Sequence, residues 1–172
     1  LYMFPEGNAV VNELVETCLP YFVVIMYAGN RGTGFTQALF MNCDHSLLTY
    51  SFYKQPRCVL KLFRIRLIEI MKINAVPALV IGLGLSALLY LSGGTDTPLS
   101  YVVLPVSILC ISLFFSVHYL TVYYLLQPYN AGTELNSGSY MLVMSATYLI
   151  CFSLMQLRVP TLLFGLLTIV FC

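Results

Sequence analysis

The sequence predicts an all-α protein, a polytopic transmembrane helical bundle, and three observations support this prediction. Hydrophobic residues make up 59% of the chain and charged residues 9%, whereas soluble domains carry about 25% charged residues. The mean hydropathy is +0.86. The apolar residues are gathered into long runs separated by short polar breaks, which is the pattern of a chain whose solvent is lipid.

The second half of the chain consists mainly of such apolar runs. The predicted spans there are residues 75–92, 99–127, 139–157 and 160–172, the last of which is truncated. Residues 75–92 contain no charged side chain, and as a helix they would extend roughly 27 Å, close to the hydrocarbon thickness of a bilayer. The chain starts at Leu1 and stops at Cys172 inside the last run. We therefore expect residues 1–172 to be a fragment of a single transmembrane domain.

The N-terminal stretch is less regular than the rest. Its apolar run from Leu19 to Gly29 is too short to cross a bilayer, so a span over residues 9–29 competes with an interfacial or re-entrant segment. If residues 9–29 span, Glu13 or Glu16 lies in or near the membrane, where a carboxylate is by default a functional-site hypothesis. The alternative places both carboxylates at the headgroup level on the outer side.

The basic residues predict the orientation. Seven of the eight Lys and Arg residues lie in one stretch, namely Arg31, Lys54, Arg57, Lys61, Arg64, Arg66 and Lys72. The positive-inside rule makes residues 30–74 a cytoplasmic loop. The Gly93–Pro98 connection is then outside and the Pro128–Gly138 loop inside, while Arg158, on the outer side, is the single exception.

The predicted cytoplasmic loop has two different halves. Residues 59–72 form an amphipathic helix, with Leu60, Phe63, Leu67, Ile70 and Met71 on one face. This helix is explained equally well as a headgroup anchor. In residues 37–56, Asn42 or Asp44 is placed to cap a short helix that exposes Asp44, His45, Tyr53 and Lys54 to a soluble partner, unless the segment is simply a solvated loop.

The stretch FMNCDHSLLTYSFYKQPRCVLKLFRIRL carries a resemblance to a known family. It is similar to the cytoplasmic segment of permease subunits of ABC exporters of the ABC-2-like kind, in which an Asn-x-Asp-x-x-Leu-Leu element precedes an Arg-bearing helix that re-enters the membrane. The stretches Val76–Ile81 and Ser112–Asn130 also resemble this family of bacterial membrane proteins. The resemblance extends from about Leu39 onward.

This resemblance implies a permease subunit that couples ATP hydrolysis by a partner ATPase to substrate export. The chain contains no Walker A sequence, so ATP and Mg²⁺ would be bound by an ATP-binding cassette subunit or domain, and the chain itself would not be an enzyme. The short cytoplasmic helix would then be a coupling helix. Its implied ATPase contacts are Asp44, Leu47, Leu48, Tyr53, Lys54 and Arg57.

The other partners implied are the lipid bilayer and a second transmembrane domain in a dimer, without nucleic acid, and the implied location is the bacterial cytoplasmic membrane, crossed several times. A reading from a different class also stands. In it, the chain is an integral membrane enzyme or a lipid-binding membrane scaffold that has no ATPase partner.

Catalytic and metal-binding patterns are missing from the sequence. It contains no H-E-x-x-H or G-x-S-x-G motif, no C-x-x-C pair among its six cysteines, and only two, widely separated, histidines. We therefore predict no catalytic residue and no bound metal. Within the predicted span 99–127, His118 with Ser116 and Tyr119 is a candidate translocation path, or else a neutral histidine bonded between helices. Gly82 and Gly84 are expected to allow close helix approach.

Overall fold

The structure is a computed structural model that describes residues 10, 13–14, 17–44, 46, 55–91, 98–129, 137–156 and 160–171. The regular elements in these ranges are helices, which confirms the predicted all-α class. Two of the described helices, α5 (Pro56–Leu91) and α6 (Ser100–Leu126), are long and apolar enough to cross a membrane. By length and composition alone, these two helices are candidate membrane spans.

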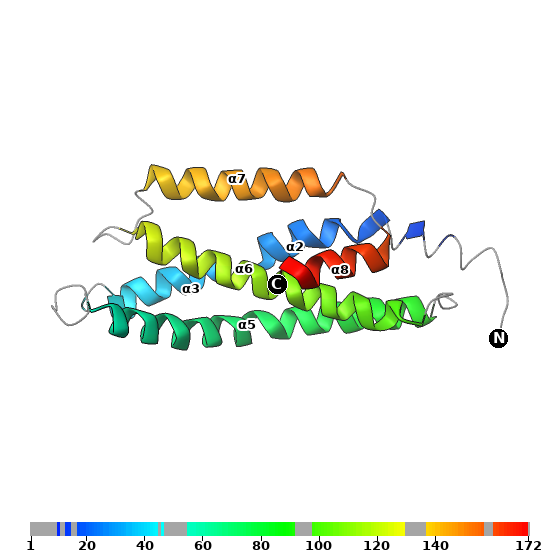
Figure 1. The fold of residues 1–172 in the computed structure, drawn as a ribbon, viewed down its shortest axis with the longest axis horizontal. Helices are drawn as coiled ribbons and strands as arrows, with labels where there is room; N and C mark the ends of the chain where they lie inside the picture. Colours follow the sequence, from blue (N-terminus) through cyan, green and yellow to red (C-terminus); the bar gives the residue numbers. More distant parts are fainter. Residues whose placement is uncertain are drawn as a thin grey trace.

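The helices run along the long axis of an elongated molecule (Figure 1). The helix α2 (Tyr21–Gly29) is followed end to end by α3 (Gly32–Leu39) and by a π-helical turn, η1 (Phe40–Asp44). The long helices α5 and α6 then traverse the molecule in opposite directions. The last two elements are α7 (Gly138–Leu154) and α8 (Thr161–Phe171), and α8 packs beside the first half of α6, where Gly165 faces Val103.

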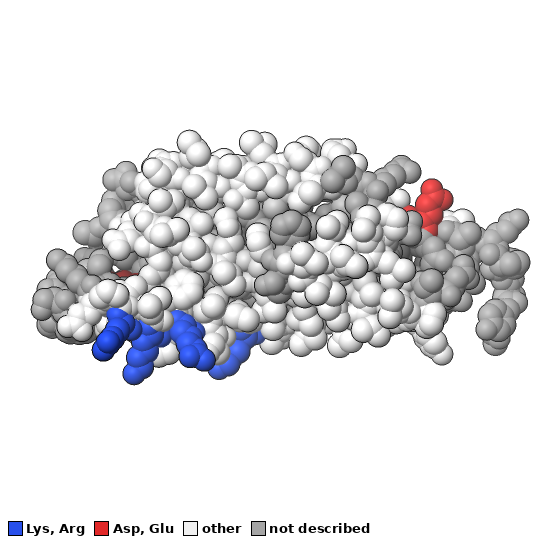
Figure 2. All heavy atoms as spheres, in the orientation of Figure 1, with Lys and Arg blue, Asp and Glu red and all other residues white. Residues whose placement is uncertain are grey.

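Several of these helices begin or end near one of the two ends of the molecule (Figure 1). One end holds η1, the start of α5, the end of α6 and the start of α7. The other end holds the start of α2, the end of α5 and the start of α6. Figure 2 shows the Lys and Arg side chains of α5 along one edge, near the first of these ends.

The structure does not separate the predicted amphipathic helix 59–72 from the predicted span 75–92, because α5 covers residues 56–91 as one helix. Helix α5 is continuous over 36 residues, roughly 54 Å at about 1.5 Å per residue. The charge of the sequence changes at Lys72, but the helix continues through Leu- and Ala-rich sequence, although Pro77, Gly82 and Gly84 disfavour helix. Pro77 lies inside α5. Much of the remaining predicted loop is also helical, as α3 and η1.

The buried core lies mainly along α6, whose side chains Leu104, Ile108 and Phe115 are at most 2% exposed. Helices α5 and α6 approach closely at Gly82, where an added Cβ would lie 2.7 Å from the Cα of Pro105. The expected role of Gly82 in close helix approach is thus confirmed. The same expectation for Gly84 is wrong, since a Cβ there would meet nothing within 4 Å.

Candidate functional site

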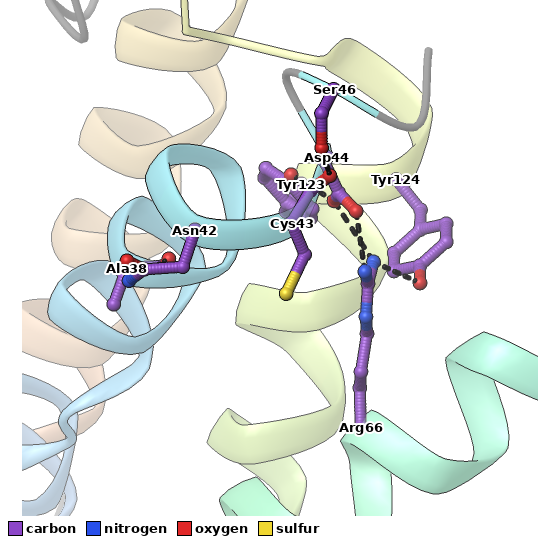
Figure 3. Close-up of polar contacts among 8 residues, drawn as sticks. All are labelled: Ala38, Asn42, Cys43, Asp44, Ser46, Arg66, Tyr123 and Tyr124. Atoms are coloured by element: carbon purple, nitrogen blue, oxygen red, sulfur yellow. Dashed lines mark hydrogen bonds and ion pairs between the residues drawn. The ribbon is translucent and has the colours of Figure 1, made fainter. Parts of the chain in front are cut away.

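A buried ion pair joins the end of η1 to both long helices (Figure 3). Asp44 is 2% exposed and Arg66 of α5 is 6% exposed. The Arg66 guanidinium donates from Nη1 to Asp44 Oδ2 at 2.9 Å and from Nη2 to Asp44 Oδ1. The Tyr123 hydroxyl of α6 donates to Asp44 Oδ2, and Arg66 Nη1 also donates to the Tyr124 hydroxyl at 2.6 Å. We call these four residues the charged cluster.

The local chain conformation turns Asp44 inward. The π-helical turn η1 carries Asp44 as its last residue. On the outer side of this turn, the exposed Asn42 side chain donates to the Ala38 carbonyl at 2.8 Å, and the Ser46 hydroxyl donates to the Cys43 carbonyl at 2.9 Å. The bidentate contact between Arg66 and Asp44 compensates the buried charge of each side chain. Removing either partner would leave an uncompensated buried charge.

A second, uncharged network surrounds the break between α2 and α3. Asn30 adopts an extended conformation there, with φ −67° and ψ 127°, which interrupts the helix. The Asn74 side chain of α5 accepts from the Arg31 backbone N–H at 3.1 Å and donates to Ser116 Oγ of α6 at 3.0 Å. Ser112 Oγ donates to the Asn74 carbonyl at 3.1 Å. We call Asn30, Asn74, Ser112 and Ser116 the neutral cluster.

The neutral cluster satisfies the backbone groups that the helix break leaves unbonded. Asn30 Oδ1 accepts from the Gly32 backbone N–H at 2.9 Å and from Asn74 Nδ2 at 3.2 Å. Asn74 is 2% exposed and Ser116 is fully buried. A buried break is stable only where such partners are supplied. The cluster therefore fixes α2 and α3 to both long helices at one point.

A tyrosine after α6 holds α3 from its other side. The Tyr129 hydroxyl donates to the Thr33 carbonyl at 3.2 Å and lies 3.2 Å from Thr36 Oγ1. Burial raises the pKa of the Tyr129 hydroxyl above its ordinary value, and the hydrogen bond with Thr36 lowers it in part. The phenol thus stays protonated at neutral pH and serves as a donor.

The three residues of the candidate translocation path point to three different neighbours. Ser116 faces α5 in the neutral cluster, and the Tyr119 hydroxyl donates to the Tyr27 carbonyl of α2 at 3.2 Å. His118 is half-buried, and its Nε2 lies 3.2 Å from Thr147 Oγ1 of α7. The structure therefore does not bring these side chains together in one lining. The contact of His118 agrees with a histidine bonded between two helices.

The predicted ATPase contacts have different positions in the structure. The expectation that Asp44 is exposed is wrong, because Arg66 and Tyr123 bind its carboxylate inside the molecule. Arg57 is exposed at the start of α5. The other four predicted contacts, Leu47, Leu48, Tyr53 and Lys54, lie outside the described residues, as does His45.

Sequence reasoning missed the partners of Asp44 and the whole neutral cluster. One signal was available. Asn74 continues the apolar spacing of Phe63, Leu67 and Ile70 in steps of three and four residues, so a polar amide falls in the buried face of a helix. A buried amide requires hydrogen-bond partners. The identity of those partners is long-range information that the spacing does not contain.

Within the described ranges, no three His, Cys, Asp or Glu residues lie close enough together to hold a metal ion. No protein-family model, curated protein or solved structure matches this chain.

Proposed function

We propose that the chain is the multi-pass permease segment of an ABC-2-like exporter in a bacterial cytoplasmic membrane, with ATP hydrolysed by a partner subunit. In this arrangement α5 and α6 span the bilayer, α7 and α8 extend the bundle, and a second such domain completes a dimer. The basic end of α5 lies on the cytoplasmic side. The segment between Asp44 and Arg57 then connects η1 to α5 at the cytoplasmic end.

The observation that carries the proposal is the charged cluster. A permease must transmit a displacement of its cytoplasmic docking segment to its spanning helices, and this requires a stiff connection between them. The docking segment, with Leu47, Leu48, Tyr53 and Lys54, directly follows Asp44. The Asp44 carboxylate is bound by Arg66 of α5 and by Tyr123 of α6. A displacement of this segment therefore acts on both long helices at once.

The neutral cluster adds a second part to this mechanism. The segment α3–η1 is joined to α2 only through the extended residue Asn30 and Arg31, so it is free of the helical continuity that would fix it to α2. Helix breaks inside membrane bundles are places where half-helices move relative to each other. In this proposal α3–η1 moves with the docking segment, and the hydrogen bonds of Asn30 and Asn74 limit the movement.

The test is purification of the full polypeptide that contains this chain from native membranes in mild detergent. We expect an ATP-binding subunit, identified by a Walker A peptide in mass spectrometry, to co-purify and to hydrolyse ATP. The variant Lys54→Glu should weaken the association several-fold, whereas Lys72→Glu, the same charge change 18 residues further along the chain, should not. A chemically cross-linked preparation that contains no ATP-binding subunit or domain would overturn the proposal.

A further inference from the structure

The outward face of the first half of α5 carries a row of cations. Arg57, Lys61, Arg64 and Lys72 are all exposed, and at about 100° per residue they fall within a sector of roughly 80° around the helix. They form the positively charged edge in Figure 2. Within the described part of the chain, Lys72 alone among them has a carboxylate partner, Glu69 at 2.8 Å. We call these four residues the basic face.

Aliphatic side chains lie between and beside these cations. Leu60, Ile65 and Ile68 are 68%, 50% and 45% exposed. A purely aqueous surface or one that contacts an acidic protein gains little from exposed aliphatic groups at this spacing. Cations mixed with aliphatic groups are typical of a surface that contacts both the phosphates and the acyl chains of a membrane.

The depth of the basic face in the molecule follows from contacts between the helices. Arg66 of α5 contacts Tyr124 of α6, and Thr147 of α7 contacts His118 of α6. Helices α6 and α7 run in opposite directions (Figure 1). Met141 lies six residues before Thr147, and Tyr124 lies six residues after His118. Because the two helices are antiparallel, Met141 is level with Tyr124. It is therefore also level with Arg66.

At this depth the opposite side of the molecule is apolar. Met141 and Leu142 are 58% and 69% exposed, and α7 contains no charged residue. Helix α7 and the basic face lie on opposite edges of the molecule in Figures 1 and 2. A bilayer that covers α7 on one edge of the molecule therefore also reaches Arg64 and Lys72 on the opposite edge. Placing these cations in hydrocarbon without anionic partners would cost free energy.

We propose that the basic face binds anionic phospholipids of the cytoplasmic leaflet, with phosphates at Arg57, Lys61, Arg64 and Lys72 and acyl chains along the aliphatic side chains between them. This inference rests on the membrane-spanning arrangement of the proposed function. Because α5 is one continuous helix, the face stands along the wall of the bundle and does not lie flat on the membrane surface. Anionic amphiphiles are thus the class of molecule that we expect to collect beside this permease.

The experiment reconstitutes the full polypeptide in vesicles of phosphatidylcholine with a minor fraction of phosphatidylglycerol. After extraction, the lipids that stay bound are measured by native mass spectrometry. We expect phosphatidylglycerol to be enriched over its bulk fraction, and each Lys or Arg changed to Gln on the basic face to lower its binding constant by roughly five-fold. The combined R57Q/K61Q/R64Q/K72Q variant should return to the bulk composition.

The matched control is Arg158→Gln, which removes a cation that the predicted orientation places on the outer side of the membrane and should leave the enrichment in the cytoplasmic leaflet unchanged. The thermal midpoint of each variant in detergent verifies that it is folded. Unchanged enrichment of phosphatidylglycerol in the combined variant would overturn the inference. It would also be overturned if the combined variant lost a bound acidic protein while its lipid enrichment stayed the same. Failure to find an ATPase would remove the proposed export function but would leave the lipid enrichment intact, so the two failures are distinguishable.

Discussion

The two halves of α5 contact α6 by different means. In the first half, taken as Pro56 to Asn74, side-chain hydrogen bonds join Arg66 to Tyr124 and Asn74 to Ser116, beside apolar packing such as Phe63 against Tyr124. In the second half Gly82 packs against the backbone of Pro105, Ala78 and Leu89 are buried, and the Ser86 hydroxyl donates to the Tyr101 carbonyl at 3.0 Å. A buried hydrogen-bonding group that loses its partner costs about 1–3 kcal/mol, whereas a close-packed contact is disturbed by added volume. The first half is therefore sensitive to the loss of a polar partner, and the second half to an enlarged side chain.

The largest effect is expected from Arg66→Met, which leaves the Asp44 carboxylate buried without its partner. We expect a loss of about 3–5 kcal/mol in the free energy of unfolding, measured by denaturant titration in mixed micelles. Arg64→Met, an exposed residue on the same helix, should change it by less than about 0.5 kcal/mol. The double variant Asp44→Leu with Arg66→Met should be more stable than either single variant. Additive losses would show that the pair is not coupled.

A smaller effect is expected in the neutral cluster. Asn74→Leu removes the acceptor of the Arg31 backbone N–H and the donor to Ser116, so we expect a loss of about 2 kcal/mol. Faster hydrogen exchange of the Arg31 and Gly32 amides should accompany it, because both belong to the helix break. Asn42→Leu is the control, since Asn42 is exposed and bonds within its own turn. Equal exchange rates in the two variants would contradict the assigned role of Asn74.

The close-packed half is tested by adding a single methyl group. Gly82→Ala places a Cβ 2.7 Å from the Cα of Pro105, which is backbone and cannot rotate away. Overpacking, partly offset by the better helix propensity of Ala, predicts a net loss of about 1 kcal/mol. Gly84→Ala meets nothing within 4 Å and should be neutral or stabilising. The reverse order of the two variants would mean that α5 and α6 pack differently in this half.

The smallest effect concerns α7, whose hydrogen bonds to the other helices are few. A double-mutant cycle of His118→Phe and Thr147→Val should give a coupling free energy of about 0.6 kcal/mol, the average for hydrogen bonds between membrane helices. Thr168→Val in place of Thr147→Val is the control, because the Thr168 hydroxyl bonds within its own helix. A coupling above about 2 kcal/mol would place His118 among the principal connections of the bundle.

The helical class and most helix positions could be predicted from the sequence, because they depend on local composition. The predicted span 99–127 agrees with α6, Ser100–Leu126, and the predicted span 139–157 begins within one residue of α7. The predicted amphipathic helix 59–72 begins within three residues of α5, but its continuation into residues 75–91 was not predicted, because the basic residues end at Lys72. Charged side chains show which part of a helix contacts water or headgroups, but they do not show where the helix ends.

The candidate site could be predicted only in part, because its contacts are long-range. Asp44 was recognised, but a carboxylate in a basic stretch was expected to be exposed. Its partner Arg66 lies 22 residues further along the chain, and its other partner Tyr123 lies 79 residues further. The residue type shows that burying the Asp44 carboxylate requires a compensating group, but the sequence does not show which residue supplies it. Leu47, Leu48, Tyr53 and Lys54 remain predictions.

The positions of Asp44 and Asn30 also have a consequence for synthesis. Both residues leave the ribosome before α5 and α6, yet their hydrogen-bond partners are Arg66, Asn74, Ser116 and Tyr123. In the proposed membrane arrangement, the segment from α2 to η1 carries an amide and a carboxylate that lipid cannot satisfy until those helices follow. We expect the α5–α6 hairpin to insert first as a stable unit and the earlier segment to join it afterwards, so its membrane integration occurs out of the order of translation.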